Sequence, residues 1–242
     1  MTYNYRSLSE AGLAKDRNED SLSIQEMEGG ILCIICDGLG GEISAAKASE
    51  VCVNTIESYF ISHAKQNYLD RVKYGILESN KKLFEFAPGE DGLKRMATTA
   101  EVLFLKNHSL FWGHIGDSRI YDLKNGKLSQ ITKDHSLVQQ MLDKGFLSMK
   151  DASQHPNKNI ITKALGEKPK IDFDLSKVIL NSKDKHRFLI CSDGVTEVLN
   201  DNELEEIVSQ RDMDKCVNIL SDEIRKRGAP DDFSFIILDH NY

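Results

Sequence analysis

Apolar and polar residues follow two different periods along this chain. Short, mostly apolar runs are typical of strands and predict them at residues 21–25, 31–36, 98–105, 109–115, 119–123, 127–131, 172–179, 187–191 and 233–238. Stretches in which apolar residues recur every three or four positions predict helices at residues 44–62, 70–86, 137–144, 149–153, 201–210 and 213–227. Because the strands come in runs and the helices in separate pairs, the pattern favours an α+β protein over a βαβ repeat.

The connections between these elements carry further signals. The step KNGK at residues 124–127 predicts a tight hairpin between two of the strands. Ser44 is a candidate N-cap of the first helix, and a loop over residues 88–95 follows the second helix. No internal repeat or low-complexity linker divides the chain, so we expect a single domain over residues 1–242.

Composition and charge narrow the class of protein. Of the 242 residues, 40% are hydrophobic and 29% are charged, which excludes a disordered or fibrous chain. The 31 Lys and Arg against 38 Asp and Glu give a net charge of −7, which argues against a nucleic-acid partner. The longest wholly apolar run, residues 31–36, is too short to cross a bilayer, and the N-terminal residues lack the apolar core of a signal peptide. We therefore expect a cytoplasmic protein with no membrane or nucleic-acid partner.

The five cysteines support a reducing compartment. Their odd number speaks against a disulfide framework in a chain of this size. Cys33 and Cys36 form a C-x-x-C pattern, but both lie within the predicted strand 31–36. Residues three apart in a strand point to opposite faces, so we expect these thiols to be separate core residues that neither pair nor chelate a metal.

Candidate chemistry lies at the ends of the predicted strands. Three apolar runs end at an aspartate beside a glycine, in the steps Asp37-Gly38, Gly116-Asp117 and Asp193-Gly194. Two acidic pairs come just before strands, Glu19-Asp20 and Asp231-Asp232. Asp and Gly are also ordinary turn residues, so each step alone has a structural explanation. If the five segments converge, however, their carboxylates would repel one another strongly unless cations neutralised them.

The donor atoms indicate which cation would suit such a cluster. Oxygen ligands without His or Cys at ligand spacing favour Mg²⁺ or Mn²⁺ over Zn²⁺. Two such ions can activate a water for attack on phosphorus. The chain has no H-E-x-x-H, no G-x-S-x-G and no G-x-x-x-x-G-K-[ST] motif, which argues against a zinc hydrolase, a serine hydrolase and a P-loop protein. Glycine at position 38 would let the backbone approach an ion closely, so that its carbonyl could act as a ligand.

Eight short motifs occur in a recognisable order. They are RNEDS at 17–21, DGLGG at 37–41, ATT at 97–99, GDSRIY at 116–121, TKDHS at 132–136, ITKALG at 161–166, SDG at 192–194 and DD at 231–232. In this order and spacing they resemble the metal-dependent protein phosphatases of type 2C (PPM), in their compact bacterial form, along nearly the whole chain. The resemblance implies a four-layer αββα sandwich of two antiparallel β-sheets flanked by helix pairs. It also implies a serine/threonine protein phosphatase, in which a water that bridges two Mn²⁺ or Mg²⁺ ions attacks phosphoserine or phosphothreonine in line.

The resemblance further implies roles for particular residues. The metal ligands it implies share an oxygen donor and are Glu19, Asp20, Asp37, Gly38, Asp117, Asp193, Asp231 and Asp232. Asp37 would bridge the two ions. The Gly38 carbonyl, Asp193 and Asp231 would complete the inner shell, and Glu19 or Asp20 would act through water. Asp117, together with Asp193, matches the family's site for a weaker third ion.

Three positions depart from the family pattern. Lys15 stands where the family has an arginine that grips the substrate phosphate, and it keeps the charge but lacks the bidentate fork. Arg17 would share a face with Lys15 in an extended stretch and could supply that fork; solvated surface charge is the alternative for both. Leu39 leaves no histidine acid at its position. Asp232 replaces the Asn that commonly follows the last ligand, so either Asp231 or Asp232 could bind the metal.

The remaining expectations concern the surroundings of the site and its partners. Residues 136–159 resemble the family's flap, which could help to select substrates, although a plain surface insertion explains them almost as well. His135 is either a hydrogen-bonded structural histidine or a participant in the chemistry. By resemblance, the protein is a monomer that acts on phosphorylated proteins and opposes a eukaryotic-like serine/threonine kinase. The alternatives are a catalytically weak, regulatory pseudophosphatase and a phosphatase of small phosphorylated metabolites.

Overall fold

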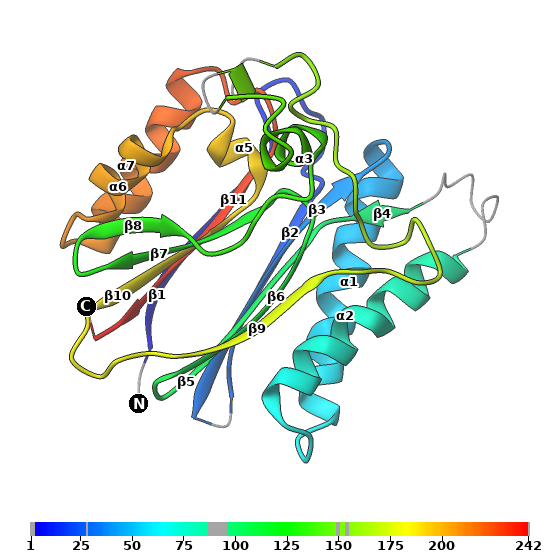
Figure 1. The fold of residues 1–242 in the computed structure, drawn as a ribbon, viewed down its shortest axis with the longest axis horizontal. Helices are drawn as coiled ribbons and strands as arrows, with labels where there is room; N and C mark the ends of the chain where they lie inside the picture. Colours follow the sequence, from blue (N-terminus) through cyan, green and yellow to red (C-terminus); the bar gives the residue numbers. More distant parts are fainter. Residues whose placement is uncertain (1–2, 28, 87–95, 149–150, 153–154, 242) are drawn as a thin grey trace.

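The computed structural model describes residues 3–27, 29–86, 96–148, 151–152 and 155–241, and two antiparallel sheets form its centre (Figure 1). One sheet has the strand order β1 (Asn4–Glu10), β11 (Phe233–His240), β10 (His186–Cys191), β7 (Arg119–Lys124) and β8 (Lys127–Gln130). The other has the order β2 (Asp20–Met27), β3 (Gly30–Leu39), β5 (Ala100–Lys106), β6 (Ser109–Ile115) and β9 (Asp174–Ile179), and the short β4 (Ala97–Thr98) pairs with the end of β3.

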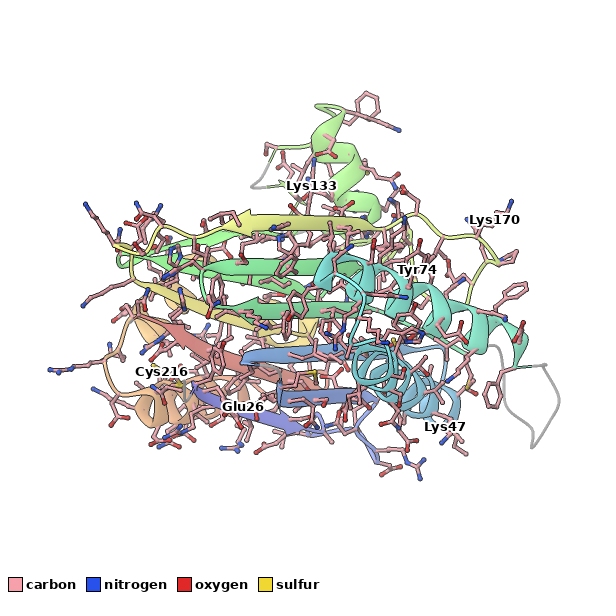
Figure 2. The ribbon with its side chains drawn as sticks, turned by 90° about the horizontal axis from the view of Figure 1, so that it is seen from below. Glu26, Lys47, Tyr74, Lys133, Lys170 and Cys216 are labelled. Atoms are coloured by element: carbon pink, nitrogen blue, oxygen red, sulfur yellow. The ribbon has the colours of Figure 1, made fainter. Side chains whose placement is uncertain are left out.

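Helices cover the outer face of each sheet (Figure 1). The pair α1 (Glu42–Ser62) and α2 (Tyr68–Glu85) lies on the six-stranded sheet, and the pair α6 (Asp201–Val208) and α7 (Met213–Lys226) lies on the five-stranded sheet. The single turn α5 (Asp193–Thr196) follows β10 directly. In the view of Figure 2, α3 (Leu137–Asp143) stands out from the body of the sandwich. The predicted α+β sandwich of four layers is confirmed.

Three hydrophobic clusters correspond to the three interfaces between these layers. One joins α1 and α2 to their sheet, one fills the space between the sheets, and one joins α6 and α7 to the other sheet. Cys33 belongs to the cluster between the sheets, whereas Cys36 belongs to the cluster under the helices. All five cysteines are buried and free, and the prediction that this C-x-x-C pair points to opposite faces is confirmed.

Sequence patterning missed or misplaced several elements. The strand β1 was not predicted, because its sequence NYRSLSE is mostly polar; it is an edge strand with alternating half-buried positions. The N-cap prediction for Ser44 is wrong, since α1 begins at Glu42 after Gly41. The predicted loop 88–95 lies outside the described residues, and of the predicted helix 149–153 only 151–152 are described, as helix. Among the described residues, no helix is both long and apolar enough to cross a membrane.

Candidate metal centre

Five aspartates from five segments gather at one end of the sandwich, and we call them the acidic cluster. They are Asp20, Asp37, Asp117, Asp193 and Asp231. Asp20 opens β2 directly opposite Asp37 in β3. Asp193 starts α5 at the end of β10, and the carboxyl groups of Asp193 and Asp37 are in hydrogen-bond contact. The negative charges of the other four aspartates all act on the Asp37 carboxyl. The five segments therefore converge in the fold, as expected from the sequence.

Burial and mutual repulsion raise the pKa values in the acidic cluster. Removal from water is the larger cause and lifts the pKa of Asp37 and Asp117 well above the usual range of a carboxyl, with repulsion by neighbouring aspartates adding to it. The same causes raise the pKa of Asp20 and of Asp193 to about 7. In the metal-free protein these groups therefore hold protons at pH values where ordinary aspartates are ionised.

Unpaired carboxylate oxygens show that the cluster suits a cation. Among the described residues, Oδ1 of Asp20, Asp117 and Asp193 is buried with no hydrogen-bond partner. The second oxygen of Asp20 accepts a hydrogen bond of 2.7 Å from Ser192 Oγ, so that side chain is held with one oxygen left over. Buried, unpaired acceptors from several segments are the donor set that a hard divalent ion requires, and these residues therefore fit Mg²⁺ or Mn²⁺.

Gly38 is fixed in place by close contacts on two sides. A Cβ atom at this position would lie 2.1 Å from the Ala45 carbonyl oxygen and 2.8 Å from that of Glu19, so no other residue fits. The preceding carbonyl, that of Asp37, accepts hydrogen bonds from Thr99 N–H at 2.8 Å and Thr98 Oγ1 at 2.7 Å. The backbone that carries Asp37 and Gly38 is thus held between the start of α1 and the threonines around β4.

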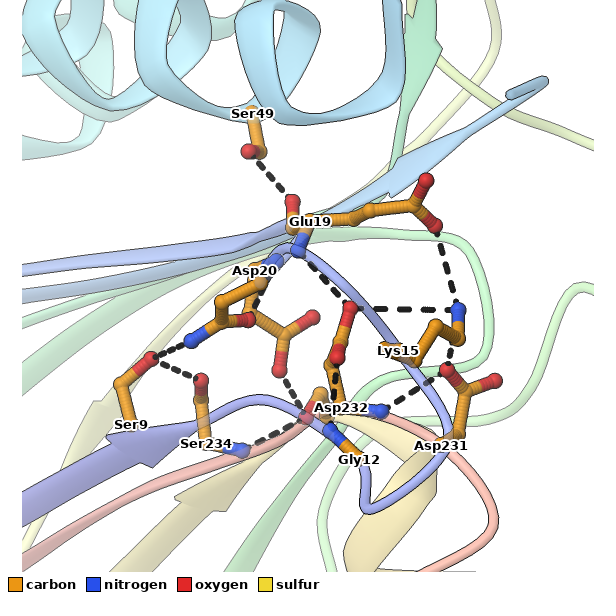
Figure 3. A network of polar contacts seen from close by, with 11 residues as sticks. Ser9, Gly12, Lys15, Glu19, Asp20, Ser49, Asp231, Asp232 and Ser234 are labelled. Carbon is orange, nitrogen blue, oxygen red and sulfur yellow. Dashed lines mark hydrogen bonds and ion pairs between the residues drawn. The ribbon is translucent and has the colours of Figure 1, made fainter. Parts of the chain in front are cut away.

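Lys15 is a cation that faces Asp231 and Glu19 at this end of the protein (Figure 3). Its Nζ lies 2.7 Å from Asp231 Oδ1 and 3.2 Å from Glu19 Oε2. Partial burial lowers the pKa of Lys15, but the hydrogen bond and charge of Asp231, followed by the hydrogen bond of Glu19 and the charge of Asp232, outweigh it and raise the pKa above the usual range. Arg17 is exposed, and within the described part of the chain its side chain has no recorded hydrogen bond or ion pair.

Neighbouring aspartates 231 and 232 have different surroundings (Figure 3). Asp232 is buried, and its two oxygens accept hydrogen bonds from the backbone N–H groups of Gly12 at 2.9 Å and Glu19 at 2.8 Å. Asp231 is 39% exposed at its side chain and faces Lys15. Asp232 therefore ties the N-terminal loop to the start of β11, whereas the Asp231 side chain stays accessible beside the other aspartates of the acidic cluster.

A cleft of about 980 Å³ extends from the acidic cluster. Asp117 and Asp193 lie in its wall, together with Val138 and Leu142 of the segment expected to be a flap and with residues from α5 to α6. On the flap side, Lys158 reaches across to Glu197 beside α5, with an N–O distance of 3.4 Å. The cleft gives a polypeptide room beside the acidic cluster.

A second polar network, of which the sequence analysis singled out only His135, braces the Gly116-Asp117 turn. The ligand atoms of His114, His135 and Asp174 lie within 4.8 Å of one another. However, Nδ1 of His135 accepts the Gly116 N–H at 3.2 Å, and the two ring nitrogens of His114 contact Glu101 and the Lys133 carbonyl. These nitrogens are already in use, so the network is structural. The sequence signal for this network was a polar residue inside each of two apolar strands, Glu101 in β5 and His114 in β6. These two residues lie directly opposite each other in the sheet.

The fold and the acidic cluster identify the class of protein. A family model described as Protein phosphatase 2C matches residues 13–229, and the chain therefore belongs to this family of metal-dependent protein phosphatases. Protein phosphatase PhpP of Streptococcus pneumoniae is 32% identical over 84% of this chain and 82% of its own. The serine/threonine phosphatase stp of Listeria welshimeri is 29% identical over 96% of this chain and 94% of its own.

A solved structure agrees with this assignment. The catalytic domain of the serine/threonine protein phosphatase PstP, crystallised with two manganese ions, superimposes with a TM-score of 0.85. The two proteins are 26% identical, and the match covers 98% of this chain and 97% of the other.

Proposed function

We propose that this protein removes phosphate from phosphoserine and phosphothreonine side chains of other proteins, with two Mn²⁺ or Mg²⁺ ions held by the acidic cluster. The observation that carries the proposal is the set of carboxylate oxygens of Asp20, Asp117 and Asp193 that are buried without a hydrogen-bond partner among the described residues. Membership of the protein phosphatase 2C family supports the reaction, and the manganese-bound structure of PstP supports the cofactor.

Charge balance supports two ions in the acidic cluster. The five aspartates of the acidic cluster carry five negative charges when ionised, and two divalent cations would neutralise four of them. We assign Asp37 and the Gly38 carbonyl to the centre of the site, with Asp193 and Asp231 as further direct ligands. Glu19 and Asp20 would act from outside through water, and Asp117 would share a weaker third ion with Asp193. Asp232 is not assigned as a ligand, because both its oxygens accept backbone N–H groups.

Lys15 is the residue proposed to bind the substrate phosphate. In the metal-free chain its ammonium is held by Asp231 and Glu19. Cations that neutralise Asp231 would free the ammonium for a phosphate oxygen at the same place. When bound, the ions would supply Lewis acidity that polarises the phosphoryl group and activates water for attack. Arg17 is left as a surface charge, since its side chain is exposed.

The substrate class follows from the family and the cleft. A phosphorylated protein can place its phosphoresidue at the acidic cluster and the adjoining segment in the cleft beside residues 136–159. A eukaryotic-like serine/threonine kinase as the opposing enzyme, a monomeric state, a single domain and a cytoplasmic location stay predictions. A pseudophosphatase is disfavoured because Asp37, Asp117, Asp193 and Asp231 are all present.

A metal add-back assay tests the proposal. Metal-stripped protein is incubated with a phosphothreonine peptide, and phosphate release is measured with Mn²⁺, Mg²⁺ or EDTA. We expect release that requires either ion, is lost in Asp193→Asn and is kept in Asp16→Asn, an exposed acid of the N-terminal loop. Release from phosphosugars but from no phosphopeptide would overturn the protein substrate, and release that EDTA leaves unchanged would overturn the metal site.

A further inference from the structure

Three histidines meet at the end of the sandwich opposite the acidic cluster. His186 begins β10, whereas Asp193 follows the other end of that strand. His240 ends β11, whereas Asp231 precedes its start. His108 lies in the turn between β5 and β6. With about 3.3 Å per strand residue, His186 lies roughly 20 Å from Asp193. The C-terminal end of β11 and the turn α5 accordingly lie far apart in Figure 1.

Two of these histidines are spaced as ligands of one ion would be. His108 Nδ1 and His240 Nε2 lie 3.1 Å apart, and their ring centroids are separated by 5.2 Å. A tetrahedral Zn²⁺ with Zn–N bonds of about 2.0–2.1 Å places two ligating nitrogens roughly 3.3 Å apart. Without an ion, the pair can be held by a single hydrogen bond between two neutral rings.

The third histidine offers an unused nitrogen. The His186 side chain is 3% exposed, and its Nδ1 lies 2.9 Å from Asp122 Oδ2. Among the described residues, its Nε2 is buried with no hydrogen-bond partner. A carboxylate on one ring nitrogen with the other left free is the usual arrangement behind a metal-ligating histidine. The His186 and His240 ring centroids are 6.4 Å apart, compared with 5.2 Å for His108 and His240, so His186 has to move inward before its Nε2 can join the other two nitrogens around one ion.

We propose that His108, His186 and His240 form a binding site for a divalent transition metal ion such as Zn²⁺, separate from the acidic cluster. Three imidazoles select such ions over Mg²⁺ or Ca²⁺, which prefer oxygen ligands. Burial, and then the fields of His108 and His186, lower the pKa of His240, which keeps its ring neutral and able to ligate at neutral pH.

An ion at this site would join the two sheets. His108 precedes β6 of the six-stranded sheet, whereas His186 and His240 belong to the five-stranded sheet. The site contains no residue of the acidic cluster. Binding of an ion to the histidines can therefore be measured in a variant whose acidic cluster carries a substitution. The expected consequence of binding is a rise of Tm that depends on the concentration of the ion.

Titration of the full chain with Zn²⁺ in excess Mg²⁺ tests the site. We expect one Zn²⁺ to bind to wild type and to Asp193→Asn, and binding to weaken by roughly a hundredfold in His240→Gln and His186→Gln, since each removes a ligand. His155→Gln, which changes a histidine of the flap segment, is the matched control and should bind as wild type does. The Tm of each variant in EDTA verifies that it folds.

Co²⁺ gives a second readout that does not depend on activity. A tetrahedral site with nitrogen ligands gives intense visible absorption bands, whereas six oxygen ligands give weak ones. We expect intense bands in wild type and Asp193→Asn, and their loss in His240→Gln and His108→Gln. Unchanged Zn²⁺ affinity in a folded His240→Gln variant, or binding that is lost only in Asp193→Asn, would overturn the proposal.

Discussion

Two buried charged sites on β10 and β11 are balanced in opposite ways. At one end, Arg187 is fully buried and donates to Asp239 at 2.5 and 3.2 Å and to the Val208 and Gln210 carbonyls at 2.7 and 2.5 Å. At the other end, Asp193 keeps a buried oxygen that has no hydrogen-bond partner among the described residues, and other acidic groups lie near it. The same two strands thus carry one site whose buried charge is balanced by groups of the chain and one whose buried charge requires added ions.

This comparison distinguishes a buried charge that stabilises the fold, as at Arg187, from buried charges that bind an external ion, as at Asp193. A buried charge can stabilise the folded state when its partners belong to the chain, and all three guanidinium nitrogens of Arg187 donate to such partners. A buried cluster of like charges opposes folding unless an external ligand balances it, and it persists because that ligand is needed for function. The predictions below test this contrast from the largest effect to the smallest.

Asp193→Asn should lower kcat by at least about a thousandfold, equivalent to about 4 kcal/mol in activation free energy. The substitution removes a charge that the metal ions require. It also removes repulsion, so the Tm of the metal-free protein should stay the same or rise. Phosphopeptide turnover and thermal unfolding in EDTA measure the two effects. A variant that keeps near-normal turnover would remove Asp193 from the metal site.

Arg187→Met should show the reverse pattern. It leaves Asp239 buried without its cation and should reduce the free energy of unfolding by about 3–5 kcal/mol. Because Arg187 lies at the end remote from the acidic cluster, the folded fraction should keep its kcat. Urea denaturation measures the loss, with exposed Lys183→Met as the control. Equal stability of the two variants would contradict the role assigned to Arg187.

Replacing aspartate with asparagine at positions 231 and 232 should distinguish the proposed metal ligand, Asp231, from the residue that holds the N-terminal loop, Asp232. Asp232→Asn leaves one amide oxygen to accept the Gly12 and Glu19 N–H groups, and should cost about 1–3 kcal/mol of stability. Asp231→Asn should leave stability unchanged and abolish Mn²⁺ binding together with turnover. Isothermal titration with Mn²⁺ and urea denaturation distinguish the two outcomes. If Asp232→Asn loses metal affinity while keeping its stability, the assignments must be exchanged.

The metal-free protein should lose stability as the pH rises. The pKa of Asp20 and of Asp193 is about 7 in the folded chain, compared with about 3.9 for an unfolded aspartate. The folded state binds more protons between these values, so the free energy of unfolding falls as pH rises from about 4 through about 7. In EDTA, Tm should be lower at pH 8 than at pH 5 by roughly 4 °C or more. Saturating Mn²⁺ should reverse this slope, whereas equal slopes with and without the ion would contradict it.

Lys15→Ala should raise KM by about tenfold, or about 1.4 kcal/mol, with a smaller change in kcat. The lost ammonium binds phosphate in the ground state and in the transition state alike. Arg17→Ala is the matched control and should leave KM unchanged. Initial rates on a phosphothreonine peptide measure both. A rise of KM in Arg17→Ala alone would move phosphate binding to Arg17.

The sequence predicted the acidic cluster because its signal is local. An apolar run that stops at an aspartate, as before Asp37 and Asp193, shows where a carboxylate leaves the core. Which segments share an end follows from strand pairing, such as Asp20 opposite Asp37, and this depends on contacts distant in sequence. Resemblance to a known family supplied that part of the prediction.

Other features lacked a local signal. The clamp role of Asp232 depends on Gly12 and Glu19, more than 200 residues away in the chain. The edge strand β1 is mostly polar and is fixed by pairing with β11 rather than by its own pattern. The three histidines at 108, 186 and 240 are widely spaced and match no ligand motif.

The pairing of β1 with β11 also determines when the protein can become active during its synthesis. Residues 4–10 lie against residues 233–239, and Asp232 holds the loop that carries Lys15 and Glu19. During synthesis on the ribosome, the edge of the first strand therefore stays unpaired until residues 233–239 have been translated. A nascent chain truncated before residue 231 would lack both the proposed metal ligand Asp231 and the Asp232 side chain that holds the N-terminal loop, so phosphatase activity should emerge only after this segment has been translated.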